Sequence, residues 1–151
     1  MAIYYFSKAD KIAFIDSNKT PIFLGEMGNN IYFSFAGNVH VPENATLATS
    51  AKIIQLQEKS VVFRGLKDEM IRRVYLEKDR DSMLLGFLDM MLLGNKKTLN
   101  TAEKARKDKL DVLSRKCIQI QNKRDEIAQL LIAGEAVDFL SDEAWIEENN
   151  G

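Results

Sequence analysis

Short apolar runs separated by polar residues fill the first 40 residues of the chain. The runs IYYF (3–6), KIAFI (11–15), PIFLG (21–25) and IYFSF (31–35) are rich in aromatic and β-branched residues. Such residues favour strands, and the Asp, Asn, Ser and Gly residues between the runs favour turns. The spacing therefore predicts a small antiparallel β-meander over residues 1–41.

Beyond Pro42, the apolar residues recur every three or four positions, which is the period of a helix. Residues 43–58 and 66–75 both show this period, and we expect helices there that pack on the sheet. Between them, the run SVVFRG (60–65) is either one further strand or the lead-in to the next helix, and we favour the strand.

The segment DSMLLGFLDMMLLG (81–94) is apolar around nearly the whole circumference of a helix. We expect Asp81 or Ser82 to cap this helix and Gly94 to end it. Its apolar part is about 17 Å long at ~1.5 Å per residue, which is too short to cross a bilayer. A helix of this kind is buried, either at the centre of the fold or between subunits. Its candidate interface residues are Met83, Phe87, Met90 and Met91.

A long helix is predicted after the loop at 95–100, where Asn100 and Glu103 form the pattern of a capping box. The helix can continue to Gly134, roughly 50 Å at ~1.5 Å per residue. It would extend beyond a compact domain of this size, so we expect part of it to need a partner, either an earlier helix or another chain. Its apolar residues repeat in steps of three and four, as in a coiled coil. This stripe consists of Leu110, Leu113, Cys117, Ile120, Arg124, Ile127 and Leu131.

The predicted fold class is α+β, with a small N-terminal antiparallel β-meander followed by a helical C-terminal half that contains one long, coiled-coil-like helix. The 151 residues fit one domain with an extended helical part. Its three successive segments are the meander (1–41), helices packing on the sheet (42–94), and the long basic helix with an acidic helical end (95–151).

The net charge of −1 conceals segments of opposite charge. Residues 1–94 are neutral, residues 95–124 carry +7 and residues 125–151 carry −8. The basic stretch can contact phosphates, pair with the acidic end of a neighbouring subunit, or simply be a solvated helix face. No aromatic interleaving and no known nucleic-acid-binding pattern accompanies it. The candidate phosphate or nucleic-acid contacts are Lys104, Arg106, Lys107, Lys109, Arg115 and Lys116.

Residues suited to catalysis or metal binding are few. His40 is the only histidine and Cys117 the only cysteine, and no motif brings either of them together with Ser34 or Asp16. One cysteine excludes an intramolecular disulfide and a cysteine-based zinc site. The acidic run EKDRD (77–81) does not match a calcium loop. We therefore expect no catalytic residues, no metal and no cofactor.

These patterns lead to the hypothesis of a non-enzymatic oligomeric interaction protein, either a small protein-binding regulator or inhibitor or an assembly subunit. It would act through its aromatic sheet and long helix, with a second copy or another protein as partner. The alternatives are a nucleic-acid-binding protein that uses residues 95–124 and a nucleotide or small-ligand-binding module. The chain start lacks the order of a signal peptide, and no apolar run reaches the ~18 residues of a membrane span. We expect a cytoplasmic location and no membrane partner.

Overall fold

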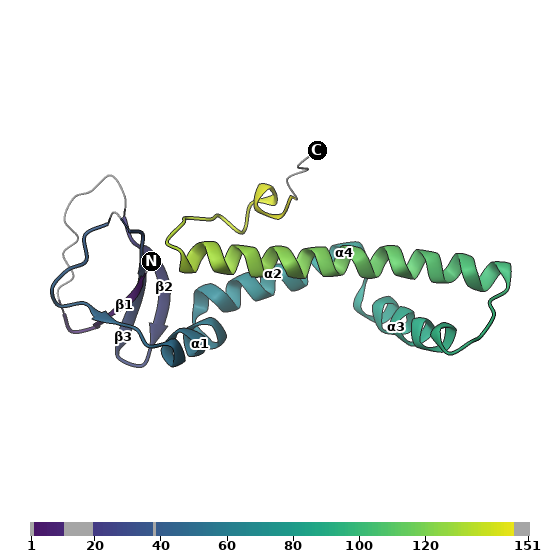
Figure 1. The fold of residues 1–151 in the computed structure, drawn as a ribbon, viewed down its shortest axis with the longest axis horizontal. Helices are drawn as coiled ribbons and strands as arrows, with labels where there is room; N and C mark the ends of the chain where they lie inside the picture. The colour runs from purple at the N-terminus through teal and green to yellow at the C-terminus, as the bar shows by residue number, and fades with distance from the viewer. Residues whose placement is uncertain (1, 11–19, 38, 147–151) are drawn as a thin grey trace. The chain divides into compact units, whose positions relative to one another are not determined.

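A computed structural model of the chain describes residues 2–10, 20–37 and 39–146. These residues form four strands, four α-helices and one short 3-10 helix (Figure 1), which confirms the α+β fold class. The strands come first along the chain and the helices follow, as the hydrophobic pattern predicts.

The chain divides into two compact units. The first unit consists of Met1–Glu69 together with Arg124–Gly151, and the second unit is Met70–Lys123. Helices α2 (Val61–Glu77) and α4 (Thr101–Ile132) each begin in one unit and end in the other. The two units are described separately below.

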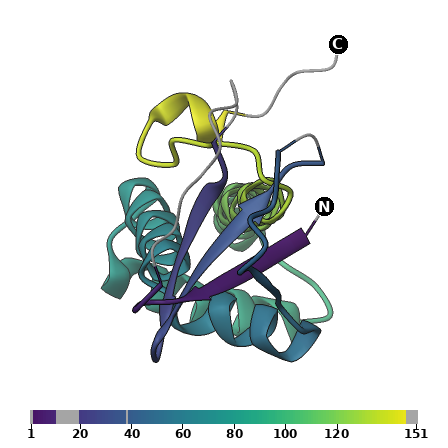
Figure 2. The same cartoon turned by 90° about the vertical axis from the view of Figure 1, so that its left-hand side faces the viewer.

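The sheet of the first unit contains β1 (Ala2–Ser7), β2 (Ile22–Met27), β3 (Asn30–Phe35) and β4 (Thr46–Leu47), visible in Figure 2. All neighbouring strands are antiparallel, and their order is β2-β3-β1-β4, so β1 lies between β3 and β4. The strand expected at 11–15 lies outside the described residues.

The alternation of side chains along these strands positions the core of the first unit. Ile3, Leu24 and Tyr32 point to the same buried cluster, which also contains residues of the helices. The register between β2 and β3 shifts between Phe23 and Gly25, and Gly25 has a φ of 129°. This irregularity matches a β-bulge, and it allows the strand to approach the helices closely.

Two expectations for the region after the sheet were wrong. The helix expected over 43–58 begins only at Ser50, because β4 pairs with β1 and Thr49 then caps α1 (Ser50–Lys59). The run at 60–65, expected as a strand, forms the first turns of α2 instead.

The start of α2 has a local cause. The buried hydroxyl of Ser60 accepts a hydrogen bond from the amide of Phe63 at 3.3 Å, as an N-cap residue does. Phe63 and Leu66 lie three residues apart and are both buried in the core cluster. Packing of one helix face therefore outweighs the strand propensity of the two valines.

Helix α3 (Arg80–Gly94) begins one turn from the end of α2. The carboxylate of Asp79 accepts a hydrogen bond from the amide of Ser82 at 2.9 Å, so the cap lies two residues before the earlier of the two expected positions. This hydrogen bond to the charged form lowers the pKa of the Asp79 carboxyl.

The predicted ends of the long helix are confirmed within two residues. The side chain of Asn100 accepts a hydrogen bond from the amide of Glu103 at 2.8 Å at the start of α4. At its end, Gly134 has a φ of 82° and the amide of Glu135 donates to the carbonyl of Leu130. This is the Schellman arrangement, in which glycine takes the left-handed position after the helix.

The last turns of α4 belong to the core of the first unit. Ile127 and Leu131 are buried in the same cluster as the sheet residues. The buried Ser34 hydroxyl of β3 donates a hydrogen bond to the carbonyl of Ile132 at 2.5 Å. The 3-10 helix η1 (Asp142–Trp145) follows, and the Trp145 indole donates to the carbonyl of Phe139 at 2.8 Å.

Candidate functional site

The second unit has almost no hydrophobic core. Across residues 70–123, all of which the structure describes, Leu93 is the only buried hydrophobic side chain. Over the same range, ten large hydrophobic side chains are exposed. Isolated exposed hydrophobic residues are normal on a protein surface, but a contiguous group of them marks a contact site.

One side of α3 faces α4 within the second unit. Met83 and Met90 of α3 line a shallow groove together with Leu110 and Leu113 of α4. At the middle of α3, a Cβ atom built on Gly86 would lie 2.9 Å from Cδ2 of Leu110. Glycine at this position therefore permits the close approach of the two helices.

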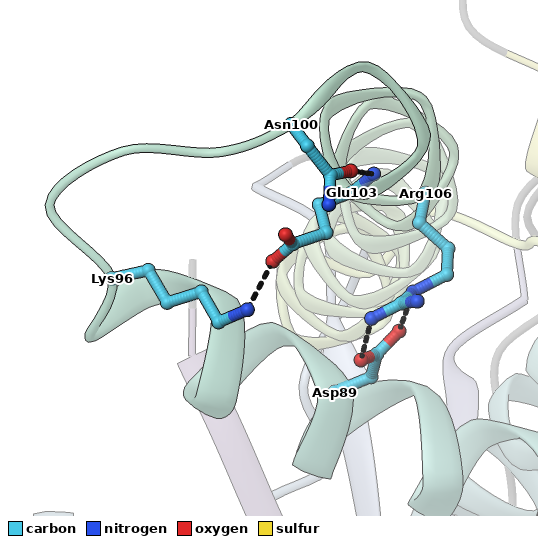
Figure 3. Close-up of polar contacts among 5 residues, drawn as sticks. All are labelled: Asp89, Lys96, Asn100, Glu103 and Arg106. Carbon is cyan, nitrogen blue, oxygen red and sulfur yellow. Dashed lines mark hydrogen bonds and ion pairs between the residues drawn. The ribbon is translucent and has the colours of Figure 1, made fainter.

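Two ion pairs join the C-terminal part of α3 and the loop that follows it to the first turns of α4 (Figure 3). The guanidinium of Arg106 binds both carboxylate oxygens of Asp89, with Nε–Oδ2 and Nη2–Oδ1 distances of 2.8 and 2.9 Å. Lys96 pairs with Glu103, whose amide is capped by Asn100. The pairing with Asp89 raises the pKa of Arg106, and the pairing with Lys96 lowers the pKa of Glu103, so both of these groups favour their charged form.

The opposite side of α3 is uncovered and is apolar beyond its first turn. At 3.6 residues per turn, its six large side chains fall within an arc of roughly 160°, which also contains Arg80 and Asp81 in the first turn of the helix. Their exposed fractions range from 54% to 67%, although each is a large hydrophobic group. We call this surface the outer face of α3. It consists of Leu84, Leu85, Phe87, Leu88, Met91 and Leu92.

The structure divides the α3 residues that the sequence nominated for an interface. Met91 lies on the outer face, and Phe87 is exposed there but also lines the groove with α4, along which Met83 and Met90 are partly buried. Sequence reasoning missed the four leucines of the outer face. The available signal was Gly86 and Asp89, whose small and charged side chains mark the side of the helix that faces α4.

The apolar stripe of α4 is largely covered by other parts of the same chain. Its first residues, Leu110, Leu113 and Cys117, line the groove with α3, and its last residues, Ile127 and Leu131, are buried in the first unit. One further apolar member of the stripe, Ile120, is partly buried. Its role in a contact with a second chain stays a prediction.

The charged member of the stripe lies in the first unit. Nε of Arg124 is 2.7 Å from Oδ1 of Asp125, an ion-pair contact without hydrogen-bond geometry. The same two residues border a hollow with Phe63 and Leu66 of α2. Arg124 thus occupies the edge of the core, with Nε buried and 34% of its side chain exposed.

Cys117 is expected to react slowly with alkylating reagents. Burial raises the pKa of its thiol, and the nearby carboxylate of Glu77 raises it further, so little thiolate is present at neutral pH. Iodoacetamide should modify native Cys117 several-fold more slowly than the urea-unfolded chain, followed by mass spectrometry. Equal rates in the two states would contradict this environment.

Several of the six candidate phosphate contacts are already bound to acidic groups. Besides Arg106, Lys107 lies 3.1 Å from a carboxylate oxygen of Asp111, and Lys116 lies 3.3 Å from one of Glu77. Nε of Arg115 donates to the carbonyl of Asp111 at 3.3 Å. The side chains of Lys104 and Lys109 are exposed. A phosphate would have to compete with these partners for most of the cluster.

The groups considered for catalysis are not brought together. Ser34 is fully buried and uses its hydroxyl in the bond to Ile132, whereas His40 is exposed in a loop. Asp16 lies outside the described residues. Among the described residues, no three or more His, Cys, Asp or Glu side chains are grouped in a way that could hold a metal ion. Nor does any helix in that part of the chain have the length and apolar character to span a membrane.

The division into units also sorts the charges of the chain. The second unit contains 13 Lys and Arg against seven Asp and Glu, a net charge of +6, and the first unit carries the remaining −7. The most specific feature of the second unit is therefore an apolar outer face on a basic helical hairpin. Comparison of the chain with protein-family models, with curated proteins and with solved structures finds no match.

Proposed function

We propose that this chain is a non-enzymatic oligomeric interaction protein whose second unit binds protein through the outer face of α3. The observation that carries the proposal is the single buried hydrophobic residue, Leu93, in the 54 residues of Met70–Lys123. Helical bundles are stabilised by rows of buried apolar residues. A unit that leaves its most apolar helix uncovered gains that stabilisation when a partner covers it.

The size of the surface supports a specific contact. Six large side chains that are more than half exposed present on the order of 600 Å², at the upper end of the largest apolar patches on typical monomers. Removing apolar surface from water contributes about 25 cal/mol per Å² before the costs of association. The face therefore offers enough driving force for a protein contact.

The hairpin presents this face in a fixed orientation. The bidentate pair of Arg106 and Asp89 joins α3 to α4 near the C-terminal part of α3. At the middle of the helix, Gly86 lies close to the side chain of Leu110. A surface held in this way loses little further conformational freedom on binding, which favours affinity.

Nucleic-acid binding through residues 95–124 remains a weaker alternative. The net charge of +6 favours contacts between the second unit and phosphate. However, four of the six nominated basic side chains already contact a carboxylate or a carbonyl oxygen. The basic side chains of this unit are thus partly neutralised by acidic and carbonyl groups of the same unit, whereas the apolar side chains of the outer face stay exposed.

The proposed function predicts that the purified chain has a mass in solution above its monomer mass of 17.2 kDa, and that the outer face causes this. Replacing Leu84 and Leu88 together with glutamate should raise the dissociation constant at least about 100-fold, because two charges would have to be buried in an apolar contact. Sedimentation equilibrium measures the mass and the constant.

The matched control replaces Val112 and Ile118 of α4 with glutamate. These two residues belong to the same unit and are also about half exposed, at 49% and 50%. The control should keep the mass of the wild-type chain, and far-ultraviolet circular dichroism should show the same helix content for both variants. A monomeric wild-type chain, or equal loss of assembly in both variants, would contradict the proposal.

A further inference from the structure

We propose that the occupant of the outer face is a second copy of this chain, and that the two α3 helices pair antiparallel about a two-fold axis that passes at Leu88. This inference rests on the proposed function and specifies its partner and geometry. It is carried by the area of the face, by the arrangement of its side chains along the helix, and by the charges at its two ends.

The area of the face fits pairing with its own copy. One partner contributes roughly 800 Å² to a protein–protein interface of standard size, and the six outer-face side chains alone supply on the order of 600 Å². In a two-fold arrangement both partners contribute the same surface, so both exposed faces are covered in one contact. A polar partner would leave this surface without a complement.

Five of the six outer-face positions are symmetric about Leu88, whereas the counterpart of Phe87 is Asp89, which faces α4. Leu84 and Leu92 lie four residues before and after it, and Leu85 and Met91 lie three residues before and after it. When two such helices run antiparallel with Leu88 at the centre, Leu88 meets Leu88, Leu84 meets Leu92 and Leu85 meets Met91. Spacings of three and four residues are those of helices that pack side by side in bundles.

The polar residues at the two ends of the face favour the antiparallel direction. Asp81 lies at the N-terminal end, seven residues before Leu88, and Asn95 lies seven residues after it, next to Lys96. Antiparallel pairing places the Asp81 carboxylate opposite the amide of Asn95 in the second copy, and it places Arg80 opposite Lys96, whose charge is compensated by Glu103. Parallel pairing would place Asp81 opposite Asp81, and it would align two helix dipoles unfavourably.

The two-fold arrangement also explains why assembly would stop at two chains. An isologous contact uses the same surface on both copies, so no outer face is left for a third chain. Each copy contributes its α3–α4 hairpin, and the two hairpins together supply the four helices of a bundle.

Cysteine crosslinking tests this register. Leu84, Leu88 and Leu92 are replaced one at a time with cysteine in a chain that carries Cys117→Ser, and each variant is oxidised under mild conditions. A disulfide needs Cβ atoms about 4 Å apart. In the proposed dimer only the Leu88→Cys variant meets this requirement, because positions 84 of the two copies lie about 12 Å apart along the axis at ~1.5 Å per residue. Non-reducing electrophoresis should show a covalent dimer for this variant alone.

The outcomes separate this inference from the proposed function. A dimeric mass with crosslinks at all three positions would overturn the antiparallel direction, and a dimeric mass with no crosslink at Leu88 would overturn the register. Either result would leave the interaction function in place. A wild-type chain that is monomeric by sedimentation would overturn both. Larger oligomers would overturn the closed two-fold arrangement.

A charge-exchange cycle gives an independent measurement. Asn95→Asp should raise the dimer dissociation constant about tenfold, because it brings two carboxylates together twice across the two-fold axis, and Asp81→Lys should raise it as well, because it adds a cation near Lys96 of the second copy. The double variant pairs lysine with aspartate, and its constant should return to within about threefold of wild type. If the double variant is as weak as the product of the two single changes, positions 81 and 95 do not face each other.

Discussion

Replacing Gly25 with alanine is expected to lower the free energy of unfolding of the first unit by about 4 kcal/mol. Gly25 has a φ of 129°, a conformation that costs other residues about 1–3 kcal/mol. A Cβ atom at this position would also lie 2.5 Å from Cβ of Ser60, and overpacking of this kind costs about 1–3 kcal/mol more. Ser60 cannot move away easily, because it is buried and caps α2. Urea unfolding followed by the fluorescence of Trp145 measures the change.

Two other glycines serve as controls for this effect. Gly28 has a φ of 57° but no neighbour within 4 Å of its Cβ position, so Gly28→Ala should cost only the backbone term of about 1–2 kcal/mol. Gly37 also has open space at its Cβ position, and Gly37→Ala should change the stability by less than about 1 kcal/mol. A Gly25→Ala variant as stable as Gly28→Ala would show that β2 does not approach Ser60 as described.

Replacing Ile127 with alanine is expected to lower the free energy of unfolding by about 2–5 kcal/mol, the range for deleting a buried isoleucine side chain. Ile127 is 1% exposed and packs in the core cluster of the first unit. The same change at Ile118, which is 50% exposed on the same helix, should shift stability by less than about 0.5 kcal/mol. Thermal unfolding by circular dichroism compares the two variants.

The comparison decides how the stripe of α4 is used. If the stripe stabilises the chain mainly through contacts inside one copy, replacing Ile127 or its buried neighbour Leu131 with alanine should lower the free energy of unfolding strongly. An Ile127→Ala variant with unchanged stability but weakened self-association would instead place this end of the stripe in a contact between chains. That result would shift the proposed interface from α3 to α4.

Local sequence chemistry predicted the features that depend on neighbouring residues. The hairpin between β2 and β3 follows from Gly28 and Asn29 between two apolar runs, and the start of α4 follows from Asn100 and Glu103. In each case the residues that form the contact lie within a few positions of one another. Their geometry is therefore encoded in a short stretch of sequence.

Features that depend on tertiary contacts could not be predicted in this way. The valines at 61–62 favour a strand by propensity, but Phe63 and Leu66 are buried by residues far away in the chain, and the segment is a helix. Nor could periodicity show which side of α3 stays uncovered, since apolar residues surround nearly all of that helix. The answer depends on Asp89 meeting Arg106, 17 residues later in the chain.

The continuity of α4 has a consequence for the order in which the chain folds. Nucleation of a helix costs the most conformational entropy, because several residues must be fixed before the first hydrogen bond forms. Each residue added afterwards contributes a hydrogen bond of its own. The burial of Ile127 and Leu131 provides such a starting point within the first unit. From there the helix can elongate backward toward Thr101 without a second nucleation event. The sheet-bearing part of the protein would in this way act as the template on which its poorly packed hairpin is built.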